Sequence, residues 1–222
     1  YVLFETEDFE SYESFKRIND RINPEKMVKV TNSGGEILIF RPDVTTQVID
    51  QLIPRWDGVT PHKFYYDTTI YTQTENGIES NRQFGVEYIS KNTSHSDRNV
   101  LSLATAILAK TGVPYVMEIG NQRFLNALFT SLDLGNDDLK TLKNLITYKD
   151  RFQLEAFLET VPLNTEYQEL LKNILSFEGS IETIEKSLQN YALTSEMQKA
   201  LDEIRAVLPV VDGANVTVDL SL

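Results

Sequence analysis

The segment Gln83-Phe84-Gly85-Val86-Glu87-Tyr88 has the residue types of a β-strand that could also bind a small charged ligand. Side chains alternate across a strand, so Gln83, Gly85 and Glu87 share one face. The opposite face, which we expect to pack into a core, carries Phe84, Val86 and Tyr88. Glycine weakens a strand unless something approaches closely, so an amide and a carboxylate on either side of it predict a floor for a small cationic ligand. A solvated sheet face is the alternative interpretation.

A second candidate is Arg41-Pro42-Asp43-Val44-Thr45-Thr46, between a predicted strand and a predicted helix. Carboxylate and hydroxyl oxygens accept hydrogen bonds from an ammonium group, which would make Asp43 and Thr45 ligand-binding residues. Alternatively, Asp43 only caps the helix that follows the proline. The residue pattern leaves both roles open.

The elements that must position these segments are a hairpin, a helix and a pair of strands. Residues 27–32 and 36–41 are β-rich and are joined by Ser33-Gly34-Gly35, whose glycines supply the positive φ of a hairpin turn. A helix then has an apolar stripe at the helical period, formed by Val44, Val48, Ile49, Leu52, Ile53 and Trp56. Two strands are predicted at 63–71 and 83–90, with a polar loop at 73–82 between them.

The remaining pattern predicts an α+β fold. A helix at 97–110 has Ser94 and Ser96 as cap candidates, and a strand at 115–119 and a helix at 122–132 follow it. Residues 136–208 carry amphipathic helices with breaks at 162–164 and Gly179, and a strand returns at 216–220. We therefore expect an antiparallel α+β core at 1–135, a helical insertion at 136–208 and a return strand of the core at 209–222. Both ends fall within strand-like patterns, which suggests a chain truncated at each end.

Composition narrows the function classes. The chain has 222 residues, no cysteine, two histidines and a formal net charge of -12. Without cysteine there are no disulfides or thiolate sites, which fits a cytoplasmic setting, and two distant histidines do not favour a metal centre. The acidic balance and the absence of a Lys/Arg cluster argue against nucleic-acid binding. No apolar run is long enough for a membrane span.

Three segments, in the right order, resemble the histidyl-tRNA synthetases. Residues 40–45 resemble the "LRP(E/D)xT" segment, 63–67 are similar to the strand that begins class II motif 2, and 83–87 match "QxGxE". The resemblance implies a class II aminoacyl-tRNA synthetase-like antiparallel sheet with flanking helices and an inserted helical subdomain. It also implies that the site for the histidine α-amino group consists of Asp43, Thr45, Gln83 and Glu87.

The chain departs from the synthetase pattern where ATP would bind. The "FRxE" of motif 2 falls on Tyr71-Thr72-Gln73-Thr74, so Thr72 replaces the arginine that holds the α-phosphate of ATP. Threonine has neither the charge nor the bidentate fork of arginine. Arg82 is no substitute, because strand alternation should point it away from the face of Gln83. The motif 1 proline is also replaced, by Val2.

A synthetase-like chain with an amino-acid site and no ATP-binding arginine resembles the regulatory-subunit family of ATP phosphoribosyltransferase (HisZ). The resemblance implies a non-catalytic protein without cofactors. Its implied partners are the short-form catalytic subunit and a second copy of the chain in a homodimer, with histidine as effector in histidine biosynthesis. The alternatives are a fragment of a histidyl-tRNA synthetase catalytic domain and a synthetase-like scaffold that senses RNA.

Overall fold

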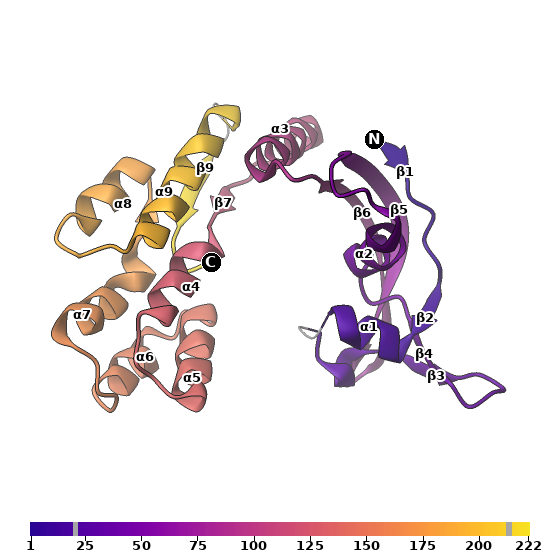
Figure 1. Cartoon of the computed structure of the whole chain (residues 1–222), viewed down its shortest axis with the longest axis horizontal. Coiled ribbons are helices and arrows are strands. Elements are labelled where there is room, and N and C mark those ends of the chain that lie inside the picture. Colours follow the sequence, from indigo (N-terminus) through magenta and orange to yellow (C-terminus); the bar gives the residue numbers. More distant parts are fainter. Residues whose placement is uncertain (20–21, 212–214) are drawn as a thin grey trace. The chain divides into compact units, whose positions relative to one another are not determined.

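The structure is a computed structural model that describes residues 1–19, 22–211 and 215–222 (Figure 1). Its contacts divide the chain into two compact units, Tyr1–Ser96 and Asp97–Leu222. Residues 212–214, part of the predicted return segment, lie outside the described residues. Each unit has a hydrophobic core of its own.

The described residues of the first unit, 1–19 and 22–96, form two three-stranded sheets and two complete α-helices. One sheet has the order β1-β5-β6, in which β1 is parallel to β5 and β5 is antiparallel to β6, and the other is antiparallel with the order β2-β4-β3. The strands are β1 (Val2–Leu3), β2 (Phe9–Ser11), β3 (Lys29–Thr31), β4 (Ile37–Phe40), β5 (His62–Thr74) and β6 (Gly77–Ile89). The helices are α1 (Tyr12–Ile18) and α2 (Thr45–Leu52), with 3-10 turns at Pro24–Lys26 and Ile53–Arg55.

Two hairpins organise this unit, and one of them is longer than predicted. The β3–β4 hairpin is confirmed, with Gly35 at φ 82°. In contrast, the polar loop predicted at 73–82 is wrong, because β5 and β6 pair continuously from His62↔Ile89 to Thr74↔Gly77. A backbone ladder does not require apolar side chains, so the polar residues extend both strands to a two-residue connection.

Helix α2 covers one face of the β5–β6 hairpin, called here the α2 face (Figure 1). Its core consists of Val44, Val48 and Tyr66, at most 4% exposed. Cross-strand pairing of Tyr66 with Gly85 places Gln83, Gly85 and Glu87 on this covered face. Phe84 is on the opposite face and is 58% exposed, so the prediction that its face packs into a core is wrong within this unit.

The predicted stripe of α2 is correct at its start and wrong at its end. The helix ends at Leu52, and Pro54 lies in the 3-10 turn that follows. Proline lacks the N–H that would continue the helical hydrogen bonds. As a result Ile53 is 47% exposed rather than part of the core.

The second unit is mainly helical. A small sheet has the order β7-β9-β8, with β7 parallel and β8 antiparallel to β9. Its strands are β7 (Met117–Ile119), β8 (Glu178–Gly179) and β9 (Val216–Asp219). The helices are α4 (Gln122–Thr130), α5 (Asn136–Thr147), α6 (Arg151–Leu158), α7 (Thr165–Asn173), α8 (Ile181–Leu188) and α9 (Ser195–Val207), with 3-10 turns at Ile174–Ser176 and Leu208–Val210; the division between the units falls within α3 (Thr93–Thr111).

Helix boundaries in this unit follow local capping. The predicted break at 162–164 is confirmed, and the Asn164 side chain caps α7 by accepting from the Tyr167 N–H. The cap of α3 is neither Ser94 nor Ser96: Asn92 accepts from the His95 N–H at 3.1 Å. The break at Gly179 is present, but it holds the short strand β8, which the helical pattern of 136–208 did not predict.

The units divide at 96–97, whereas the sequence pattern predicted a first boundary at 135–136. Helix α4 explains the difference, because Phe124 and Leu128 are fully buried in one core with the helices that follow. Residues 97–135 therefore belong by contact to the helical unit. Across the described residues, no helix has both the length and the apolar character to cross a membrane.

Candidate functional site

The loop that carries the candidate residues is held by Arg41, which is 2% exposed. Its guanidinium donates to the backbone oxygens of Glu7 (2.6 Å) and Thr69 (2.6 and 3.0 Å). It also meets the exposed Asp8 carboxylate at 3.4 Å. Through these hydrogen bonds Arg41 connects the segment before α2 to the N-terminal segment and to β5.

Asp43 caps α2, as the simpler of the two interpretations predicted. Its Oδ2 accepts from the Thr46 N–H at 2.7 Å and from the Thr46 hydroxyl at 2.5 Å. Both bonds use the same oxygen, and Oδ1 accepts no hydrogen bond from any described residue. Capping therefore leaves one carboxylate oxygen for a ligand, and the two roles do not exclude each other.

Thr45 and Glu87 are brought together from distant parts of the chain. The Thr45 hydroxyl donates to Glu87 Oε1 at 2.5 Å and links the first turn of α2 to β6. Burial raises the pKa of Glu87; the Thr45 hydrogen bond opposes this shift and the Asp43 charge adds to it. Because the nearby Asp43 charge disfavours ionisation of Glu87, a cation bound beside these two carboxylates would be stabilised.

Gln83 lies on the α2 face of β6, four residues before Glu87. It pairs in register with Thr68, whose hydroxyl lies 3.0 Å from that of Thr6. The structure thus groups Asp43, Thr45 and Glu87, and places Gln83 on the same face of β6 without a hydrogen bond to them among the described residues.

Tyr66 is a residue of this site that sequence reasoning missed. A Cβ at Gly85 would lie 2.2 Å from Tyr66 Cζ and Oη, so the space above this glycine holds the tyrosine ring. The predicted open floor for a ligand at Gly85 is therefore wrong. The cross-strand pair of an aromatic residue with a glycine was the signal, but it required the register of β5 and β6.

Glu10 and Gln47 form a hydrogen-bonded pair that the sequence analysis did not identify. Gln47 is 3% exposed, and its amide donates to the Glu7 backbone oxygen at 2.9 Å and to Glu10 Oε1 at 3.3 Å. Burial raises the pKa of Glu10 to about 7; the Gln47 hydrogen bond opposes this, and the charges of Asp43 and Asp50 add to it. No local sequence pattern signals this arrangement, because Glu10 lies in β2 and its hydrogen-bond partner Gln47 lies in α2.

Thr72, at the arginine position of the synthetase pattern, and Arg82 lie on opposite faces of the hairpin. Thr72 follows Tyr66 at even spacing along β5 and so shares the α2 face. Arg82 is on the other face, as predicted, and makes two hydrogen bonds to Asp67 at 2.8 and 2.7 Å. The site therefore has hydroxyl and carboxylate acceptors, and Arg82 is committed elsewhere.

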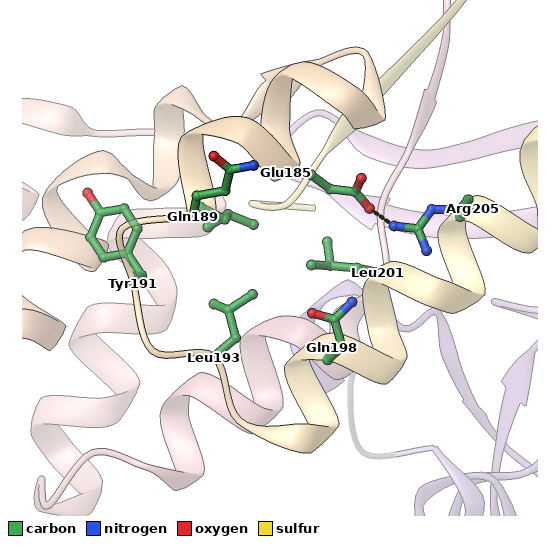
Figure 2. A pocket seen from close by; sticks show the side chains of 8 residues that line it. Glu185, Gln189, Tyr191, Leu193, Gln198, Leu201 and Arg205 are labelled. Carbon is green, nitrogen blue, oxygen red and sulfur yellow. Dashed lines mark hydrogen bonds and ion pairs between the residues drawn. The ribbon is translucent and has the colours of Figure 1, made fainter.

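A separate groove of about 420 Å³ lies in the helical unit between α8 and α9 (Figure 2). Leucine and glutamine side chains and Tyr191 line it, and Glu185 and Arg205 form an ion pair within it. Its two charged lining groups neutralise each other. None of the predicted site residues lies there.

The fold is that of a class II synthetase-like module. A family model described as Histidyl-tRNA synthetase matches residues 1–222, and the chain belongs to that family. A structure from Bacillus halodurans C, described as an ATP phosphoribosyltransferase regulatory subunit/histidyl-tRNA synthetase, has a TM-score of 0.87 at 26% identity and covers 100% of this chain and 60% of that one. The predicted class II synthetase-like α+β fold is thereby confirmed.

Two further likenesses concern ATP phosphoribosyltransferase. The regulatory subunit from Caldanaerobacter subterraneus subsp. tengcongensis is 28% identical over 205 residues, which are 90% of this chain and 53% of that protein. A structure of the ATP phosphoribosyl transferase (HisG:HisZ) complex from Thermotoga maritima has a TM-score of 0.69 at 17% identity, covers 100% of this chain and 76% of that one, and shows the fold alone. The chain spans about half the length of the curated relatives it matches.

Proposed function

We propose that this chain belongs to a non-catalytic regulatory subunit of ATP phosphoribosyltransferase and binds histidine as a feedback effector of histidine biosynthesis. The site keeps Glu87 and Asp43 as acceptors for an ammonium group and has Thr72 where the synthetase pattern requires arginine. This combination carries the proposal. It supports amino-acid binding, and it replaces the arginine that would hold the α-phosphate of ATP by an uncharged side chain.

The partner in this proposal is the short-form catalytic subunit, in a complex that also contains a homodimer of this chain. The similarity to relatives named as regulatory subunits supports it. Histidine must bind one state of the complex more tightly than another, because an effector without differential affinity shifts no equilibrium. A cytoplasmic setting, where free histidine is available, fits this role.

Isothermal titration of the full-length protein with histidine tests the site. Glu87→Gln should weaken binding at least about 10-fold, because it removes a charge-assisted hydrogen bond to the ammonium group. Asp43→Asn retains an oxygen that can cap α2 and should weaken binding with little change in unfolding. Glu79→Gln, an exposed position on β6, is the matched control. Full affinity in folded Glu87→Gln would remove Glu87 from the site.

The same titration with the short catalytic subunit added tests regulation. A changed histidine affinity demonstrates coupling, and equal affinities with and without the partner contradict it. A pyrophosphate-exchange assay distinguishes the synthetase alternative. We expect no ATP-dependent exchange, and robust exchange would assign the chain to an active synthetase.

A further inference from the structure

The Tyr66 hydroxyl occupies the centre of the candidate site. The ring lies against Gly85, where an added Cβ would sit 2.2 Å from Cζ and Oη and 2.7 Å from Cε2. Gly85 lies between Gln83 and Glu87 on the α2 face of β6. Because the hydroxyl lies above this glycine, it is located between the amide and the carboxylate of the proposed ligand site.

This hydroxyl has no hydrogen-bond partner among the described residues, and its oxygen is not fully buried. Tyr66 is only 4% exposed, yet no buried side-chain nitrogen or oxygen among those residues lacks a partner. The Tyr66 hydroxyl oxygen therefore retains some solvent-accessible surface. A largely buried tyrosine whose hydroxyl keeps access to solvent at a binding site is well placed to contact a ligand.

The hydroxyl is a neutral donor among acceptors. Burial, with the charges of Glu87 and Asp43, raises the pKa of Tyr66 to about 12. It therefore keeps its proton at neutral pH and can donate a hydrogen bond. Ionised Glu87 and Asp43 accept hydrogen bonds only, so the site offers acceptors for a cationic group and one donor beside them.

We propose that the Tyr66 hydroxyl donates to the carboxylate of the bound ligand, so that the site selects an α-amino acid over the corresponding amine. This inference rests on the proposed histidine site and adds its specificity. In an α-amino acid the carboxylate adjoins the carbon that bears the ammonium group, so acceptors for one and a donor for the other must be neighbours. Thr72 is six residues from Tyr66 along β5, roughly 20 Å of extended strand, and is too far to serve.

The test compares histidine with histamine, which has the same imidazole and amine but no carboxylate. Isothermal titration of the full-length protein should show tighter binding of histidine. Tyr66→Phe should weaken histidine binding about 10- to 100-fold, as expected for a hydrogen bond to a charged group, and leave histamine binding unchanged. Gly85→Ala should also weaken histidine binding, because the new Cβ displaces the ring while the hydroxyl is kept.

Tyr65→Phe is the matched control, because it removes the same atom from the neighbouring residue on the opposite sheet face. It should leave both affinities at the wild-type value. Equal losses for both ligands in Tyr66→Phe, or no loss for either, would overturn the inference while Glu87→Gln still reports on the site. A wild-type protein that binds neither ligand would overturn the site itself and this inference together.

Discussion

At the residue scale, Glu10 is a carboxylate whose ionisation works against folding. It is half-buried, and burial is the largest cause that raises its pKa to about 7. Between its usual value of 4.5 and about 7, the folded state holds a proton that the unfolded state has released. The free energy of unfolding should therefore fall as pH rises through this window.

Glu10→Gln tests that sign. The variant keeps an oxygen that can accept from Gln47 and has no charge to lose, so its stability should not decline across the window. We expect it to match the wild type near pH 5 and to exceed it by about 1–3 kcal/mol at pH 8. Urea denaturation at the two pH values measures this, and parallel pH profiles for the two proteins would contradict it.

At the scale of elements, the start of α2 is positioned from both sides. Arg41 ties it to the N-terminal segment and β5 through backbone oxygens, and Thr45 ties it to β6 through Glu87. The helix can present Asp43 beside Glu87 only when both connections hold. The stability of the fold and the affinity for the ligand should therefore fall together when the Arg41 connection is weakened.

Arg41→Lys tests this connection. A lysine ammonium cannot reproduce the planar fork that contacts two separate carbonyl oxygens, so buried acceptors lose their donors. We expect a loss of about 2–4 kcal/mol in the free energy of unfolding, together with weaker histidine binding. Asp8→Asn is the control, since Asp8 is 70% exposed and an exposed ion pair contributes at most about 1 kcal/mol. Comparable losses in the two variants would contradict the proposed role of the carbonyl contacts.

At the scale of the whole molecule, the two units have separate cores. Leu128 is fully buried in the helical unit, and Val48 is fully buried beside Tyr66 in the first. All four predicted site residues belong to the first unit. Damage to the helical core should therefore affect stability without affecting the histidine site.

Leu128→Ala should lower the free energy of unfolding by about 2–5 kcal/mol through the cavity it creates, and histidine affinity should stay within about two-fold of wild type. Val48→Ala should lower both stability and affinity, because Val48 packs against Tyr66. Denaturation and titration of each variant provide the measurements. A large loss of affinity in folded Leu128→Ala would show that the site depends on both units.

Local physics made part of this structure predictable. Gly34 and Gly35 signalled a hairpin, the residues at 162–164 signalled a helix break, and strand alternation separated Arg82 from Gln83. Pro42 and the following helix also indicated a cap at Asp43, as one of the two roles that the residue pattern left open. Each of these depends only on neighbours in the chain, where residue type restricts φ, hydrogen bonding or side-chain direction.

Which face of the β5–β6 hairpin is covered was decided by tertiary structure. Alternation determines that Phe84 and Glu87 face opposite ways, but the path of α2 determines which face is covered, and the helix packs on the face that carries Glu87. The Tyr66 ring above Gly85 and the carboxylates around Glu10 depend in the same way on packing between segments far apart in the chain. The sequence by itself therefore determined the candidate residues and their strand parity, whereas the structure decided their neighbours, because burial and charge act through space.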